Sequence, residues 1–171
     1  NGSFHQDEYI AGSYVFGPGK TIVALGNTVN VLQDNWPIEM IGLIGQGVRI
    51  GNWARHIHYL ENHIIGDPTH YFDSASRKDW NRLMVHKKNH VKTWIREMEN
   101  PDPDIQALAL TMLYNNKLDG LPEMLLKKME SSPYGSVRMQ SLSLLRQYND
   151  QHYIEALKLA TVDPYELIRR I

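Results

Sequence analysis

The chain has 171 residues, of which 42 % are hydrophobic and 22 % are charged. This composition predicts a packed core, and the length allows one domain of ordinary size or two small ones. The formal net charge of −1 gives no general attraction to nucleic acid, and no uncharged apolar stretch approaches the ~20 residues of a bilayer-spanning helix. The chain contains no cysteine, which excludes disulfides, zinc–thiolate sites and a cysteine nucleophile within it.

The start of the chain lacks the features of a targeting signal. Asn1–Phe4 contains no initiator methionine, no basic segment and no apolar segment. Either a targeting segment has been removed, or the chain begins inside a larger protein. The motifs described below favour the second interpretation.

Glycine content divides the chain into two parts. Ten of the twelve glycines lie between Gly2 and Gly66, which predicts strands, turns and helices there and almost pure helix afterwards. After a helix over Glu8–Phe16, the apolar run Thr21–Leu25 predicts a buried strand of a parallel sheet. A helical stretch over Asn35–Leu60 follows, then a turn at Ile64–Pro68 and a final edge strand over Thr69–Phe72.

Residues 77–96 form a basic segment whose apolar side chains recur at helical spacing. Seven lysines and arginines against Asp79 alone give this segment a charge of +6. A basic amphipathic helix can dock an acidic partner or a membrane surface. A solvated helix that joins two domains explains the pattern equally simply, and we favour that interpretation.

From Asn100 onward the sequence repeats. Three units begin at Pro103, Pro133 and Pro164, and their first aliphatic residues Ile105, Val137 and Leu167 recur with a period of about 30 residues. Each full unit contains two short amphipathic segments, which predicts stacked helix pairs. The pattern resembles HEAT-type repeats, whose units open with an Asp/Pro turn followed by an aliphatic residue and often arginine. The expected core residues are Ile105, Leu108, Met112, Leu125, Val137, Leu142, Leu145, Leu157 and Leu167.

Two further patterns are similar to functional motifs, but we do not expect either to form a functional site. Gly17–Thr21 ends like a phosphate-binding loop, but it lacks the earlier glycine of that motif and a strand follows it instead of a helix. Histidines gather between His56 and His70, and His86 and His90 have the i,i+4 spacing of a helical metal site. The second pair lacks a carboxylate and lies among cations, so we expect no metal and no cofactor.

Four short strings occur in a characteristic order between Asn1 and Phe72. Asn1–Phe4 is followed by the strand Thr21–Leu25 with Gly26–Asn30, then by Trp36, and finally by Ile64–Thr69. This order resembles the C-terminal half of the catalytic domain of gingipain-like cysteine peptidases, which have a caspase-like α/β fold. The resemblance implies peptide hydrolysis by a Cys/His dyad through a thioester. It places the cysteine two positions before Asn1 and the histidine earlier still, so this chain alone would be inactive.

The same resemblance assigns roles to a few residues of this chain. It implies a substrate pocket lined by Trp36, with Asn1, Thr28 and Asn30 as further candidates. The loop between Thr28 and Trp36 is longer than in the family, so a core or helix-capping tryptophan is an equal alternative. Ser3 stands where the family usually has aspartate in the turn beyond the cysteine.

The string Gly66-Asp67-Pro68 is implied to form a structural turn. In this interpretation the carboxylate of Asp67 accepts hydrogen bonds from backbone amides and takes no part in catalysis.

The sequence therefore predicts an α/β segment with a partial caspase-like sheet, followed by an all-α HEAT-like solenoid. Residues 1–75 would be the C-terminal part of the peptidase domain, 76–99 a linker helix and 100–171 the repeats. The expected protein is a secreted or envelope-associated peptidase that binds a peptide or protein substrate, with a protein partner on its repeats and the missing N-terminal half completing the domain. The alternative is a non-catalytic scaffold for protein–protein interaction. A nucleic-acid partner and a membrane span are not expected.

Overall fold

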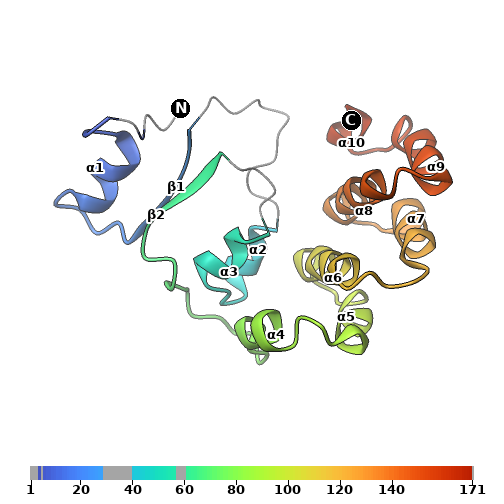
Figure 1. Ribbon diagram of the computed structural model, residues 1–171, viewed down its shortest axis with the longest axis horizontal. Helices are drawn as coiled ribbons and strands as arrows, with labels where there is room; N and C mark the ends of the chain where they lie inside the picture. The colour runs from blue at the N-terminus through green and yellow to red at the C-terminus, as the bar shows by residue number, and fades with distance from the viewer. Residues whose placement is uncertain (1–3, 5, 29–39, 57–60, 171) are drawn as a thin grey trace. The chain divides into compact units, whose positions relative to one another are not determined.

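The computed structural model describes residues 4, 6–28, 40–56 and 61–170 (Figure 1). The chain divides into two compact units, Asn1–Met84 and Val85–Ile171. Helices dominate, and a small antiparallel sheet lies in the first unit. None of the helices in the described ranges is long and apolar enough to cross a membrane. The elements are α1 Ile10–Phe16, β1 Val23–Asn27, α2 Gly42–Gly45, α3 Ile50–Ala54, β2 Asn62–Gly66, α4 Trp80–His86, α5 Val91–Glu97, α6 Pro103–Asn115, α7 Leu121–Ser131, α8 Gly135–Tyr148, α9 Gln151–Ala160 and α10 Glu166–Arg169.

The sheet of the first unit pairs β1 with β2 in antiparallel register, with Val23 opposite Gly66 and Asn27 opposite Asn62. The prediction of a parallel sheet is therefore wrong for the described residues, and the strand starts at Val23 instead of Thr21. All five residues of β1 are half-buried, so the prediction of a fully buried strand is wrong as well. An apolar run favours a strand that is covered on both faces. It carries no information on the direction of the neighbouring strand, which is set by the connection between the two.

Helix α1 covers one face of this sheet, and it ends at Phe16 as predicted. A Cβ atom on Gly26 would lie 2.8 Å from the ring of Phe4 and 3.7 Å from the Cβ of Ala11, so the absence of a side chain lets the helix approach the strand. The ring of Phe4 also meets Tyr9 and His63 edge-on, at centroid distances of 5.2 and 5.1 Å. The small residue Gly26 thus lets α1 pack closely on β1, and the aromatic rings fill the space beside the strand.

The helix predicted over Asn35–Leu60 is wrong in the described part of that stretch, where only the short helices α2 and α3 form. Gly47, with φ of +78°, turns the backbone between them. The side chain of Asn81 then fixes this turn to the start of α4. Its amide donates to the carbonyl of Gly47 at 2.9 Å, and its oxygen accepts from the backbone amide of Arg49 at 2.8 Å. Around the turn the unit buries Leu43, Val48, Ile50, Trp53, Trp80 and Met84.

The basic segment 77–96 forms two helices, α4 and α5, where the pattern predicts one. The indole nitrogen of Trp94 donates to the carbonyls of Lys87 and Lys88, at 3.1 and 2.9 Å. In a continuous helix those carbonyls would accept from backbone amides one turn later. The indole shares these carbonyls with the backbone amide of His90, which donates to Lys87 at 2.9 Å, and with the side-chain amide of Asn116, which donates to Lys88 at 2.7 Å. The break between the two helices is thus closed by several hydrogen bonds, and the apolar spacing on both sides of it is preserved.

Helix α6 is the central helix of the second unit. Asp102 caps it by accepting from the amides of Asp104 and Ile105, and Pro103 occupies the first turn, where its missing N–H costs nothing. Every residue from Ile105 to Leu113 is buried, because α5, α7 and α8 pack around the helix. Because other helices surround α6, its sequence has no continuous polar face.

Helices α6–α10 of the second unit lie in two rows, with α6, α8 and α10 in one and α7 and α9 in the other (Figure 1). The first seven of the nine predicted core residues, from Ile105 to Leu145, are buried. Leu157 and Leu167 are only half-buried, and Ile154 of α9 is 50 % exposed. Helix α9 packs mainly against α7 and α8, so part of its apolar surface faces solvent.

Candidate functional site

The structure does not assemble the predicted substrate pocket. Asn1, Asn30 and Trp36 lie outside the described residues. Thr28 follows β1 directly, and its amide donates to the carbonyl of Glu61 at 3.0 Å. Its observed role is to extend the pairing of β1 with β2 by one hydrogen bond.

The string Gly66-Asp67-Pro68 forms a tight turn at the end of β2. Asp67 accepts from both the amide and the hydroxyl of Thr69, at 2.8 and 2.7 Å, and these hydrogen bonds lower the pKa of its carboxyl group. The carbonyl of Pro68 accepts from the amide of Gly51 at 2.7 Å, which attaches the turn to α3. The carboxylate is thus engaged in holding the turn.

Two boundaries near this turn differ from the prediction. Ile64 and Ile65 belong to β2 and not to a turn, and Thr69–Phe72 is not a strand. The reason is Gly66, whose φ of +105° redirects the chain out of the sheet. The carbonyl of His70 then accepts from the amide of Ile50, so this segment follows α3 instead of a strand.

Three turns of the second unit share one hydrogen-bond pattern, and each precedes a helix of the same row. In each turn a polar side chain accepts from the backbone amide two residues later. The pairs are Asn100 with Asp102 at 3.0 Å, Ser132 with Tyr134 at 3.3 Å and Asp163 with Tyr165 at 2.7 Å.

A second hydrogen bond recurs in the same three turns. A long side chain on the following helix donates back to the carbonyl of the residue six positions earlier. The donors are Gln106 to Asn100 at 2.6 Å, Arg138 to Ser132 at 2.8 Å and Arg169 to Asp163 at 2.5 Å. In each turn the residue before the donor is a buried aliphatic one, and in the third this is Ile168, not Leu167. The repeat register read from Leu167 is therefore wrong by one position.

The second and third turns are joined by a buried ion pair. The guanidinium of Arg138 donates from Nε and Nη2 to the two carboxylate oxygens of Asp163, each at 2.8 Å. Arg138 is 8 % exposed and Asp163 is 6 % exposed. The hydrogen bonds raise the pKa of Arg138 and lower that of Asp163, so both groups remain charged. The first two turns are joined by the hydroxyl of Tyr134, which donates to the carbonyl of Pro101 at 3.1 Å.

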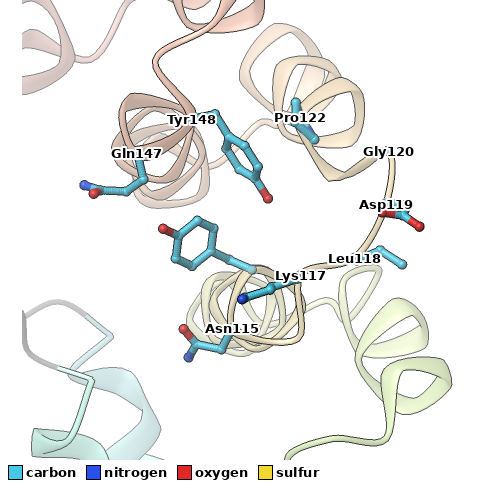
Figure 2. A pocket seen from close by; sticks show the side chains of 9 residues that line it. Asn115, Lys117, Leu118, Asp119, Gly120, Pro122, Gln147 and Tyr148 are labelled. Carbon is cyan, nitrogen blue, oxygen red and sulfur yellow. The ribbon is translucent and has the colours of Figure 1, made fainter.

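A hollow of about 570 Å³ lies at the other end of these helices, where α6 and α8 end and α7 begins (Figure 2). We call it the tyrosine hollow. Tyr114 and Tyr148 meet edge to face, with centroids 5.6 Å apart and ring planes at 86°. Figure 2 shows the ring of Tyr148 directed into the space beside Pro122. The hollow is lined by Tyr114, Asn115, Lys117, Leu118, Asp119, Gly120, Pro122, Gln147 and Tyr148.

The backbone around the tyrosine hollow adopts left-handed conformations at three places. Lys117, Gly120 and Asn149 have φ of 52°, 74° and 50°. Glycine and asparagine are common in this region, whereas a lysine there is unusual. Burial raises the pKa of Tyr148, and the neighbouring Tyr114 and Asp150 add to the effect, so its hydroxyl stays protonated at neutral pH.

Sequence reasoning did not identify the tyrosine hollow. The available signal was the dipeptide Tyr-Asn, which occurs at Tyr114-Asn115 and again one repeat later at Tyr148-Asn149. Within a repeated sequence, the recurrence of an aromatic residue at the end of each first helix marks residues that meet when those helices pack side by side.

In the described ranges no group of three or more His, Asp or Glu side chains is arranged to hold a metal ion. The tyrosine hollow is a candidate binding surface in the described part of the second unit. No family model, curated protein or solved structure matches this chain.

Proposed function

We propose that residues 100–171 form a protein-binding module of HEAT-type repeats. The observation that carries this proposal is the recurrence of both turn hydrogen bonds at Asn100, Ser132 and Asp163. A repeated turn gives each helix pair the same orientation to the next one. Stacks of this kind expose extended surfaces and bind proteins or peptides along them.

The surface of the helices supports a binding role. Val162 is 78 % exposed and Ile154 is 50 % exposed, on α9 and the turn that follows it. The core beneath is close-packed and includes a buried hydrogen bond from the amide of Gln140 to the hydroxyl of Thr111, at 2.9 Å, between α8 and α6. A rigid core under an open surface lets a partner bind without first ordering the helices.

Selection of peptides by the complete chain tests this proposal. Random peptides of about twelve residues displayed on phage are selected against the full chain, and recurrent ones are synthesised. We expect at least one to bind with saturation and to slow amide hydrogen exchange in α6–α9. If no peptide recurs, or if protection is confined to Asn1–Met84, the module is not a binding site for proteins.

We also propose that this module is attached to a gingipain-like cysteine endopeptidase, secreted or associated with the cell envelope. The support is the order of the four strings between Asn1 and Phe72, the last of which includes the turn Gly66-Asp67-Pro68 at the end of β2. The reaction would use a cysteine and a histidine outside this chain. The cysteine thiolate would attack the peptide carbonyl, and the histidine would protonate the leaving amine.

A hydrolysis assay on the protein with its preceding residues tests the peptidase proposal. We expect cleavage of a fluorogenic peptide that iodoacetamide abolishes, because alkylation removes the thiolate. Trp36→Ala should raise KM if this residue lines the substrate pocket, whereas Trp80→Phe, at a buried tryptophan, should leave KM unchanged. Absence of hydrolysis, with no cysteine preceding Asn1, would instead favour the non-catalytic scaffold.

A further inference from the structure

The loop between α6 and α7 contains the one Asp–Gly pair of the sequence, Asp119-Gly120. Both residues are exposed to solvent. They lie at the centre of a tight turn, in which the amide of Leu121 donates to the carbonyl of Leu118 at 3.3 Å. Gly120 has φ of 74° and ψ of 9°, and it is the N-cap residue of α7.

The carboxylate of Asp119 and the amide of Gly120 are both free of hydrogen bonds in the described part of the chain. The carboxylate has no hydrogen-bond or ionic partner among those residues, and Figure 2 shows it directed away from the tyrosine hollow. The amide donates to no acceptor there either. The turn itself is held by long hydrogen bonds, since Met124 donates to the carbonyl of Gly120 at 3.4 Å, where about 2.9–3.0 Å is usual.

The backbone nitrogen of Gly120 is also open to approach. Any other residue type would carry a Cβ atom next to this nitrogen, which would crowd a group that comes close to it. The surroundings add no obstacle, because the nearest atom to a Cβ at this position would be a carboxylate oxygen of Glu123, 3.9 Å away. Glycine also changes its backbone conformation at little steric cost.

We propose that Asp119-Gly120 is a site of spontaneous covalent modification, where the chain forms a succinimide and then an isoaspartate. The proposal does not depend on the proposed binding function. The reaction needs a carboxyl group and the next backbone amide, both free to meet, and water is its only other reactant. The exposed turn before α7 provides all three.

The reaction has two steps. In the first, the amide nitrogen of Gly120 bonds to Cγ of Asp119, and the hydroxyl of the protonated carboxyl group leaves with the amide proton as water. This closes a five-membered ring. In the second, water adds to one of the two ring carbonyls and breaks its bond to nitrogen. Opening at Cγ restores aspartate, whereas opening at the former main-chain carbonyl leaves the main chain running through Cβ and Cγ, which is isoaspartate.

Several other aspartates of the described residues are protected from this reaction. In Asp79 and Asp150 the carboxylate accepts from backbone amides, at 2.9 and 3.0 Å. Asp73 is exposed like Asp119, but the next residue, Ser74, carries a Cβ, which makes Asp73 the internal comparison. Three more aspartates are followed by proline, whose nitrogen has no hydrogen to lose: Asp67, Asp102 and Asp163.

Isoaspartate changes the turn because Cβ of Asp119 joins the main chain. The main chain is then one atom longer between Leu118 and Gly120. The hydrogen bond from Leu121 to Leu118 and the left-handed N-cap at Gly120 both depend on the original length. The same loop lines the tyrosine hollow, so we expect the start of α7 and this hollow to open.

Peptide mapping of the folded full chain tests the proposal. The chain is kept at physiological temperature for several weeks and then digested with trypsin, which releases residues 118–127 by cleavage after Lys117 and Lys127. The isoaspartyl form of this peptide has the same mass, elutes separately and resists endoproteinase Asp-N, and the succinimide form is lighter by one water. We expect isoaspartate to form at Asp119 at least about tenfold faster than at Asp73, which corresponds to a barrier about 1.4 kcal/mol lower. Equal rates at the two positions would overturn the proposal.

Two comparisons show whether the folded turn permits the reaction. Asp119→Glu keeps the charge but would have to close a six-membered ring, so its peptide 118–127 should stay a single species. The full chain unfolded in urea gives the rate without the turn, and we expect the folded chain to react within about tenfold of that rate. A folded chain that forms no isoaspartate while the unfolded chain does would show that the turn protects the pair, and the proposal would be wrong.

Hydrogen exchange of the aged sample tests the structural consequence. Amides at 118–122 should exchange faster than in the fresh chain, because the start of α7 opens more easily. Limited digestion of the folded sample with trypsin should also cut sooner after Lys117. Unchanged exchange in a sample that is mostly isomerised would overturn the expected opening of this turn.

Discussion

Arg138 and Asp163 are joined by two hydrogen bonds of 2.8 Å, and Arg138 also donates to the carbonyl of Ser132 at 2.8 Å. The guanidinium thus connects the turn before α8 with the turn before α10. Two charges taken out of water stabilise the fold only while each has the other, because an unpaired buried charge is very unfavourable. The pair connects successive turns with both of its charged side chains buried.

Asp163→Ala should lower the free energy of unfolding by about 3–5 kcal/mol, since it leaves the guanidinium of Arg138 buried and unpaired. The double variant Arg138→Met/Asp163→Ala should recover much of this loss, because neither charge is then buried. Asp119→Ala, which removes an exposed carboxylate, should change the value by about 0.5 kcal/mol or less. Urea unfolding followed by far-UV circular dichroism measures all three, and a double variant no more stable than Asp163→Ala would contradict the argument.

The pH dependence of stability should also show the contribution of the Arg138–Asp163 ion pair. The hydrogen bonds from Arg138 lower the pKa of Asp163 in the folded state, so its stabilising contribution is complete above the ordinary aspartate pKa of about 3.9. The contribution is lost as the pH falls below that value and through the folded-state pKa. Between pH 5 and pH 2, roughly the range over which aspartates titrate, the wild type should lose more stability than Arg138→Met/Asp163→Ala. Parallel acid dependences would show that Asp163 is not held by the arginine.

The sequence identifies the helices of the second unit well, because local signals define them. The Asp102-Pro103 cap marks the start of α6, and aliphatic spacing marks the buried faces of α7 and α8. The position of the third turn was harder to assign. Leu167 and Ile168 are adjacent and equally apolar, and only the hydrogen bonds made by Asp163 decide which one enters the core.

Features that depend on distant residues were not predictable in this way. The direction of β2 relative to β1 depends on the long connection between Asn27 and Asn62. The break between α4 and α5 depends on which carbonyls the indole of Trp94 reaches. The tyrosine hollow exists because packing of α8 against α6 brings Tyr148 to Tyr114.

Leu142→Ala should lower the free energy of unfolding by about 2–5 kcal/mol, because it opens a cavity in a close-packed core. Leu142 is 1 % exposed, whereas Ile154 is 50 % exposed, so Ile154→Ala should cost about 1 kcal/mol or less. Thermal melting compares the two variants. If the proposed peptidase activity is observed, hydrolysis at low temperature should survive Leu142→Ala, since contacts in a stacked repeat are between nearest neighbours. Loss of that hydrolysis with the helices still folded would show that the repeats are coupled to the proposed active site.

Gly66→Ala should destabilise the first unit by at least about 2 kcal/mol, because its φ of +105° is unfavourable for alanine. A Cβ there would also overlap the carbonyl oxygen of Ile22, a backbone atom that cannot move away freely. Gly45→Ala is the matched control, since a Cβ at that helical position meets nothing within 4 Å. The control should stabilise the unit by about 0.5–1 kcal/mol. Near-equal melting temperatures for the two variants would contradict the role assigned to Gly66.

His152 should titrate above its ordinary pKa of about 6.5, because Asp150 accepts a hydrogen bond from its protonated ring. Nδ1 of His152 lies 3.1 Å from the carboxylate of Asp150, which also caps α9 through the amides of His152 and Tyr153. A raised pKa means that the ring stabilises the fold below about pH 6.5 and loses this contribution as the pH rises through the folded-state value. Asp150→Ser keeps the helix cap and removes the charge, so it should lower the pKa of His152 without unfolding α9. Proton NMR titration of the imidazole measures both proteins, and an identical pKa in the two would show that Asp150 acts only as a cap.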